Sequence, residues 1–126
     1  MHRYKFSKSV RLLRSSEFDR VFRFRRSASD GLVIVYVAHG DGEQPRLGLT
    51  VSRKCGNAVL RNRWKRSLRE AFRLAQHELP RYLDIVVLPV QGAVPDVSRL
   101  RKSLIELSAK LADRMPSLRP PNSALP

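Results

Sequence analysis

The chain has 126 residues, one cysteine, few acidic residues and no long hydrophobic run, and each of these shortages excludes a class of protein. Cys55 has no partner for an internal disulfide, so the sequence does not indicate an exported, disulfide-stabilised scaffold. The longest apolar run, 32–38, has seven residues, whereas a membrane-spanning helix needs about 20. The basic N-terminus leads into no apolar stretch and is not expected to be a secretory signal. We expect a cytoplasmic protein with no membrane association, with one domain over 1–115 and a proline-rich, flexible tail over 116–126.

The sequence also lacks a recognisable catalytic or metal-binding cluster. His2, His39 and His77 are scattered without the spacing of metal ligands, and Cys55 has no histidine near it in sequence. No two acidic residues are placed on one face in a way that suits acid–base or two-metal hydrolysis. A nuclease that works with its own side chains is therefore poorly supported, and no pattern indicates a small-molecule substrate.

Basic residues, by contrast, are abundant and clustered. Lys and Arg number 25 against 11 Asp and Glu, a net charge of +14. Residues 1–29 carry +7, residues 46–76 carry +8 and residues 97–126 carry +4, and the two stretches between them are acidic. A clustered excess of one sign indicates a binding face for a polyanion, whereas a uniform spread would indicate only solubility.

Hydrophobic periodicity and capping residues predict a small α+β domain of one sheet packed with helices, in the order α-β-β-α-β-α. The first helix is expected to begin with Ser15 or Ser16 as its cap and to end near Arg25. Two strands, 32–38 and 47–51, are expected to form an antiparallel hairpin through the turn at 39–42. A long helix follows Asn57, an apolar strand at 82–89 is expected at the centre of the sheet, and a last helix begins after Asp96 and ends near Met115.

The long helix after Asn57 carries the most information about function. Its apolar residues fall on an arc between about 280° and 20°, which suits packing on the sheet. Five cations and Asn62 occupy the neighbouring arc, and Glu70 is the one acid beside them. Cations four residues apart on a helix repel one another when no anion lies beside them. A solvated basic face is the alternative interpretation, but the density of arginine favours phosphate binding.

Two further features lie beside this helix in the sequence or in the expected fold. The loop 52–57 brings Arg53 and Lys54 to the helix N-terminus, where backbone N–H groups attract phosphate. Phe18, Phe22 and Tyr36 suit either core packing or a stacking platform for unpaired bases, and periodicity does not choose between these two roles.

Several stretches of the chain resemble the protein component of bacterial ribonuclease P. They are 46–54 (RLGLTVSRK), 56–59 (GNAV), Arg61-Asn62-Arg63, Lys65-Arg66 and 69–72 (REAF). Glu17-Phe18, Val21-Phe22 and Val35-Tyr36 extend the resemblance, which covers residues 8–115.

The resemblance implies an accessory subunit without a catalytic residue of its own. The RNA subunit of such an enzyme, with its bound Mg²⁺, removes the 5′ leader from precursor tRNA. The implied fold is a two-layer α+β sandwich with a small, mostly antiparallel sheet, similar to a domain of a small-subunit ribosomal protein. The residues implied to bind the RNA subunit are Arg53, Lys54, Arg61, Asn62, Arg63, Lys65, Arg66 and Arg69, and those implied to bind the leader are Phe18, Phe22 and Tyr36.

Two other functions remain open from composition. A structural RNA-binding protein, for example a ribosomal one, would use the same basic helix without a role in cleavage. A basic amphipathic protein on an anionic membrane is disfavoured, because Trp64, Leu68 and Phe72 lie beside the cations and are expected to pack on the sheet.

Overall fold

A computed structural model describes residues 11–12 and 14–115 as an α+β fold of three helices and a four-stranded sheet, which confirms the predicted fold class. The predicted tail, 116–126, lies outside the described residues. The helices are α1 (Ser15–Phe24), α2 (Ala58–Ala75) and α3 (Val97–Asp113). The strands are β1 (Arg26–Ser29), β2 (Val33–His39), β3 (Arg46–Leu49) and β4 (Leu83–Pro89), and short 3₁₀ turns occur at η2 (Arg53–Cys55) and η3 (Gln76–Glu78).

The caps of the two long helices are those that the sequence predicts. The Asn57 side chain accepts a hydrogen bond from the backbone N–H of Leu60 at 2.9 Å, and Asp96 accepts one from Arg99 at 3.0 Å. The predicted cap of α1, Ser15 or Ser16, is wrong by one or two positions, because Arg14 is the N-cap residue and its N–H donates to Glu17 at 3.1 Å. The Glu17 carboxylate thus accepts a hydrogen bond from a backbone N–H at the helix start, a role that a serine side chain was expected to have.

The strands form one sheet in the order β1-β2-β4-β3. β1 with β2 and β2 with β4 are antiparallel, whereas β3 with β4 is parallel. The predicted hairpin between residues 32–38 and 47–51 is therefore wrong, since β4 lies between β2 and β3. Six of the seven residues of β4 are buried, so the most apolar strand takes the centre, as predicted. Because β4 lies between them, β2 and β3 are two strand spacings apart, about 10 Å in total, and the connection 40–45 is long enough to cross this distance.

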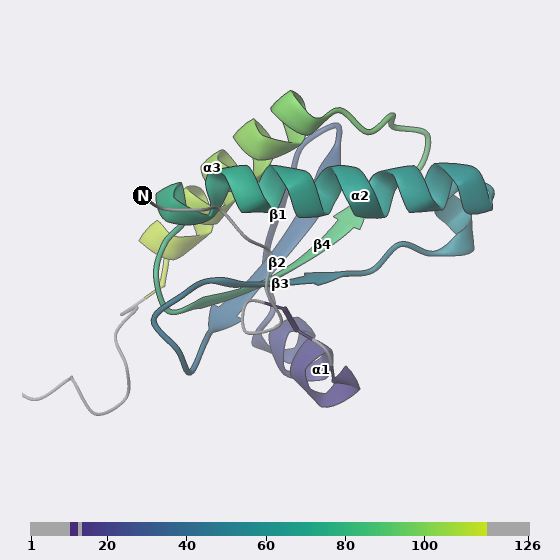
Figure 1. Ribbon diagram of the computed structural model, residues 1–126. Coiled ribbons are helices and arrows are strands. Elements are labelled where there is room, and N and C mark those ends of the chain that lie inside the picture. The colour runs from purple at the N-terminus through teal and green to yellow at the C-terminus, as the bar shows by residue number, and fades with distance from the viewer. Residues whose placement is uncertain (1–10, 13, 116–126) are drawn as a thin grey trace, which may run out of the picture.

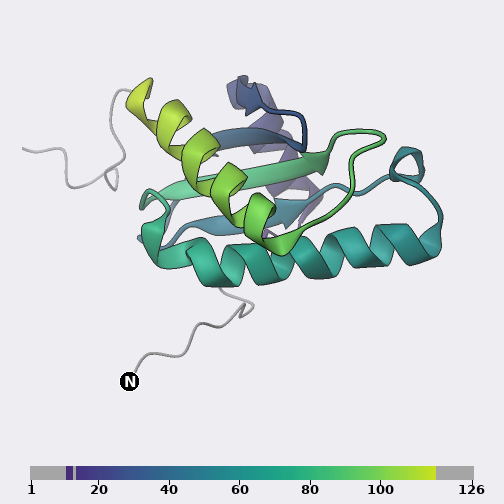
Figure 2. The same cartoon turned by 90° about the horizontal axis from the view of Figure 1, so that it is seen from above.

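Helices lie on both faces of the sheet, as Figure 1 shows, with α2 and α3 above it and α1 below. Figure 2 shows α3 running obliquely over the strands beside α2. The main core lies between the sheet and these two helices and includes Val35, Trp64, Phe72 and Leu104, all without exposed surface. A smaller cluster lies between α1 and the opposite face of the sheet, where Val21 packs against side chains of β2 and β4. α1 is short and covers only part of its face.

A buried ionic network attaches α1 to the sheet. The Asp84 side chain in β4 is only 1% exposed. Arg46 in β3 donates to it from Nε at 2.9 Å and from Nη2 at 2.8 Å, and Arg20 in α1 donates from Nη2. Arg46 also donates to Glu17 of α1 at 3.0 Å, and Arg20 donates to the backbone oxygen of His39 at 2.6 Å. Two carboxylates and two guanidinium groups, which we call the Asp84 network, therefore join α1, β3 and β4 with no net charge.

The Asp84 network also explains why residue 40 is a glycine and why the pKa of Arg46 is raised. A β-carbon at Gly40 would lie 2.8 Å from the Asp84 carboxylate, so a larger residue would displace the acid. Hydrogen bonds to Asp84 raise the pKa of the Arg46 guanidinium, against the opposing effect of burial. Arg46 therefore stays protonated as a partner of the buried acid.

A second carboxylate joins the β1–β2 turn to α3. Asp30 accepts hydrogen bonds from the N–H groups of Leu32 at 2.8 Å and Val33 at 3.0 Å, and from the Ser103 hydroxyl at 2.6 Å. Burial acts to raise the pKa of Asp30, but these hydrogen bonds outweigh it and the pKa is lowered. The ionised form is thus favoured in the folded state.

Replacing Asp84 by Ala is expected to destabilise the protein by about 3 kcal/mol, because two arginines lose their buried partner. Chemical denaturation measures this change. Asp41→Ala removes an exposed acid of the β2–β3 connection and is the matched control. An equal loss in both variants would contradict the role of the network.

The lowered pKa of Asp30 predicts a pH dependence of stability. Its contribution is present above the unfolded-state pKa and is lost as pH falls through the lower folded-state pKa. Asp30→Asn should therefore be less stable than the unmodified protein at pH 7, by less than about 1 kcal/mol because the carboxylate is partly exposed. Thermal unfolding between pH 7 and pH 3 should show the difference shrinking, and a constant or growing difference would contradict the assignment.

Candidate nucleic-acid interface

Helix α2 turns one stripe of side chains into the core and leaves its cations outside. The stripe consists of Trp64, Leu68, Ala71, Phe72 and Ala75, all fully buried as the sequence predicts. Of the predicted RNA-subunit-binding residues, Arg61 and Lys65 are half-buried. The exposed ones are Arg53, Lys54, Asn62, Arg63, Arg66 and Arg69. The structure thus brings all eight to one helix and the turn before it.

The turn before α2 is held by local hydrogen bonds from both its backbone and a side chain. The Ser52 hydroxyl accepts from the N–H of Lys54 at 3.3 Å, and Gly56 has a φ of 126° that favours glycine. A β-carbon at Gly56 would lie 2.6 Å from the Leu60 side chain. Arg53 and Lys54 are therefore presented by a compact turn at the start of α2, where backbone N–H groups also favour anions.

Arg63 lies on a different side of α2 from Arg61 and Lys65. Its Nη2 is 3.5 Å from the backbone oxygen of Pro95, in the connection between β4 and α3. Arg63 and Arg66 line a shallow groove together with Ser67, Glu70 and Val97 of α3. The predicted residues thus present cations along two sides of the helix.

Glu70, the one acid of α2, is already paired within the helix. Arg73 donates to it from Nε at 2.8 Å and from Nη2 at 2.6 Å. The hydrogen bond from Arg73 lowers the pKa of Glu70 and raises that of Arg73. Because Glu70 is ionised and bound to Arg73, it does not neutralise the other cations of α2.

Phe18, Phe22 and Tyr36 meet where α1 crosses the sheet. The rings of Phe22 and Tyr36 make an edge-to-face contact with centroids 4.9 Å apart. Phe18 packs on Gly48 of β3, where a β-carbon would lie 2.7 Å from its ring. All three aromatic side chains are half-buried, so they pack in the smaller cluster and also keep exposed surface.

The sheet surface beside these aromatics contains residues that sequence reasoning missed. Ser27 lies opposite Tyr36, and Ser29 lies opposite Ile34, so these side chains share the face on which α1 lies. Both serines are exposed, and Ile34 is half-buried. β1 was not predicted because Arg26–Ser29 is short and polar, and Ala28 is its one apolar residue.

Neither a metal-binding cluster nor a membrane-spanning helix occurs among the described residues. No three His, Cys, Asp or Glu side chains within 11–12 and 14–115 gather in a way that could hold a metal ion. No helix in that part of the chain is both long and apolar enough to cross a membrane.

The sequence is similar to known proteins over most of its length. The sequence model of the family described as Ribonuclease P matches residues 6–112. The ribonuclease P protein component of Desulfosudis oleivorans is 37% identical over 118 residues, which cover 93% of this chain and 98% of that protein.

Solved structures give the same result. The ribonuclease P protein of Staphylococcus aureus, solved at 2.0 Å, has a TM-score of 0.70 and 32% identity, with 83% of this chain and 96% of that chain covered. The ribonuclease P protein of Thermotoga maritima has a TM-score of 0.66 and 30% identity, with 85% and 98% covered. The sequence match and the shared fold together show that this chain belongs to the ribonuclease P protein family.

Proposed function

We propose that this chain binds two RNAs through two separate surfaces, and so assists removal of the 5′ leader from precursor tRNA. The basic surface, defined as the eight predicted residues of α2 and η2, binds the catalytic RNA subunit. The aromatic surface, defined as Phe18, Phe22 and Tyr36 with the neighbouring sheet, binds the single-stranded leader. The observation that carries the proposal is this separation of cations on α2 from half-exposed aromatics beside α1.

The basic surface suits a folded RNA because its cations far outnumber the acids beside them. α2 contains one acid, Glu70, and it forms an ion pair with Arg73. Arginine offers a planar set of donors that matches phosphate oxygens. The repulsion among Arg61, Lys65 and Arg69 is relieved when phosphates lie between them.

The aromatic surface suits an unpaired strand because it offers ring faces beside hydroxyl groups. Unpaired bases stack on aromatic side chains and form hydrogen bonds with polar groups nearby. Tyr36 supplies a ring in the middle of the sheet, and Ser27 and Ser29 supply hydroxyl groups next to it. A duplex would not expose its bases to such a surface.

The reaction itself is assigned to the RNA subunit and its Mg²⁺. The acids Asp84, Asp30 and Glu70 already accept hydrogen bonds from protein donors, and no metal-binding cluster is found among the described residues. The protein contributes binding and orientation: cations hold phosphates of the RNA subunit, and aromatic rings hold bases of the leader.

Adding the protein to the RNA subunit and precursor tRNA at low Mg²⁺ should accelerate leader removal, because protein cations take over part of the screening that Mg²⁺ supplies. The rate of 5′ leader release measures this. The control is the protein and precursor without the RNA subunit, which should yield no cleavage. Absence of stimulation would favour a structural RNA-binding role and contradict the proposal.

Replacing Arg61 and Lys65 by Ala should weaken binding to the RNA subunit and reduce its salt dependence. Each lost phosphate contact removes about 0.7–0.9 from the slope of log K against log salt concentration. The pair Lys102→Ala and Lys110→Ala removes the same charge from exposed positions of α3 and is the control. An unchanged slope in the α2 variant would place the RNA subunit elsewhere.

Replacing Tyr36 or Phe22 by Ala should reduce the preference of the holoenzyme for precursor over mature tRNA, since a stacked base contributes about 1–3 kcal/mol. Affinity for the RNA subunit should stay unchanged. Tyr36→Phe keeps the ring and should keep most of the preference. If precursor and mature tRNA lose affinity equally, the aromatic surface does not bind the leader.

A further inference from the structure

A hollow of about 260 Å³ lies at the C-terminal end of α2. Three segments far apart in sequence form it: residues 43–45 of the β2–β3 connection, residues 76–79 after α2, and Arg81 before β4. α2 has 18 residues, so about 27 Å of helix separate this end from the η2 turn. None of its lining residues belongs to either surface described above, and Arg69, the member of the basic surface nearest to Gln76 in sequence, is about 10 Å away along the helix.

The backbone holds one wall of the hollow in place. Tyr82 has a φ of 60°, a left-handed conformation that aromatic residues rarely adopt. Its N–H donates to the Glu43 oxygen at 3.0 Å, and its own oxygen accepts from Gly40 at 2.8 Å. These bonds fix the Glu43 and Arg81 side chains at the same rim, where they form an ion pair at 3.9 Å. A strained residue that is held in this way indicates a preformed site.

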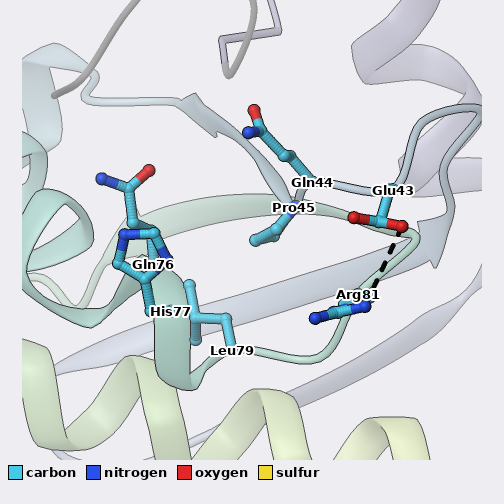
Figure 3. Close-up of a pocket in the computed structure, with 7 residues that line it drawn as sticks. All are labelled: Glu43, Gln44, Pro45, Gln76, His77, Leu79 and Arg81. Carbon is cyan, nitrogen blue, oxygen red and sulfur yellow. Dashed lines mark ion pairs between the residues drawn. The ribbon is translucent and has the colours of Figure 1, made fainter. Parts of the chain in front are cut away.

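The lining combines an apolar floor with hydrogen-bonding side chains, among them the imidazole of His77. Pro45 and Leu79 are buried and form the floor. Figure 3 shows the amides of Gln44 and Gln76 on two sides of the hollow, and Glu43 with Arg81 on a third. A carboxamide carries two N–H donors and one acceptor oxygen. The Gln76 nitrogen donates to the backbone oxygen of Arg73 at 3.3 Å, which orients this amide at the end of α2. The one acid and the one guanidinium pair with each other at the rim, so the hollow suits a flat ligand with donors and acceptors on its edge.

We propose that this hollow, the Gln44–Gln76 pocket, takes one unpaired nucleobase. A base has apolar faces for Pro45 and Leu79, and an edge of donors and acceptors for the two amides. The source of the base is the RNA that the basic surface binds, so that part of the inference rests on the proposed function. A free nucleoside offers the same chemistry, and the experiment below separates the two sources.

The glutamines themselves report on the pocket. The chain has three glutamines, Gln44, Gln76 and Gln91, and Gln91 is exposed in the β4–α3 connection outside the pocket. In ¹H–¹⁵N spectra of the full chain, titration with adenosine, guanosine, cytidine or uridine should shift the side-chain amides of Gln44 and Gln76 in a saturable way. The Gln91 amide should stay in place as an internal control. No shift with any of the four nucleosides and with a short single-stranded oligonucleotide, or equal shifts at all three glutamines, would overturn the proposal.

The second arm uses the complex with the RNA subunit. In the complex with unmodified protein, one unpaired base should be protected from chemical modification, and it should become reactive with the double variant Gln44→Leu, Gln76→Leu but not with Gln91→Leu. The affinity of the double variant for the RNA subunit should fall about fivefold, the lower end for loss of one recognised base. Amide shifts without any protected base would support the pocket with a free nucleoside as its ligand. Stimulation of leader removal at low Mg²⁺ is measured separately, so it can succeed or fail independently of the amide shifts.

Discussion

The position of α1 depends on one buried carboxylate. Asp84 lies in the central strand and accepts hydrogen bonds from an arginine of β3 and an arginine of α1. Without these bonds, α1 would be held to the sheet mainly by the small cluster around Val21. The network therefore sets where Phe18 and Phe22 lie relative to Tyr36, and so it forms the aromatic surface.

Elsewhere in the structure, too, acids are held by donors of the protein, and this shapes the charge distribution. Several acids are engaged in structural contacts: Asp84 in the network, Asp30 in the β1–β2 turn, Asp96 at the start of α3 and Glu70 beside Arg73. Engaged acids do not neutralise cations elsewhere. A net charge of +14 on the whole chain thereby becomes a surface on α2 and η2 that carries cations almost without acids. A polyanion binds such a surface more strongly than the total charge alone would suggest.

The sequence predicted the elements that depend on local patterns and missed those that depend on pairing between distant segments. Asn57 and Asp96 cap helices through bonds three residues away, so they could be recognised. The place of β4 between β2 and β3 follows from competition among strands for the centre of the sheet, and a turn motif at 39–42 does not contain that information. The role of Asp84 was also hidden, since its partners are 38 and 64 residues away. The basic surface was predictable because one helix carries most of it, whereas the serines beside Tyr36 required the unpredicted strand β1.

We propose that two surfaces of this small protein hold two different RNAs at once. Site-specific photo-crosslinking in the reconstituted holoenzyme tests it most directly, with the crosslinker at Ser27 on β1 in one variant and at Arg69 on α2 in the other, since both positions are exposed. We predict that the label at 27 joins the 5′ leader of precursor tRNA and that the label at 69 joins the RNA subunit. Crosslinks from both positions to the same RNA would contradict it.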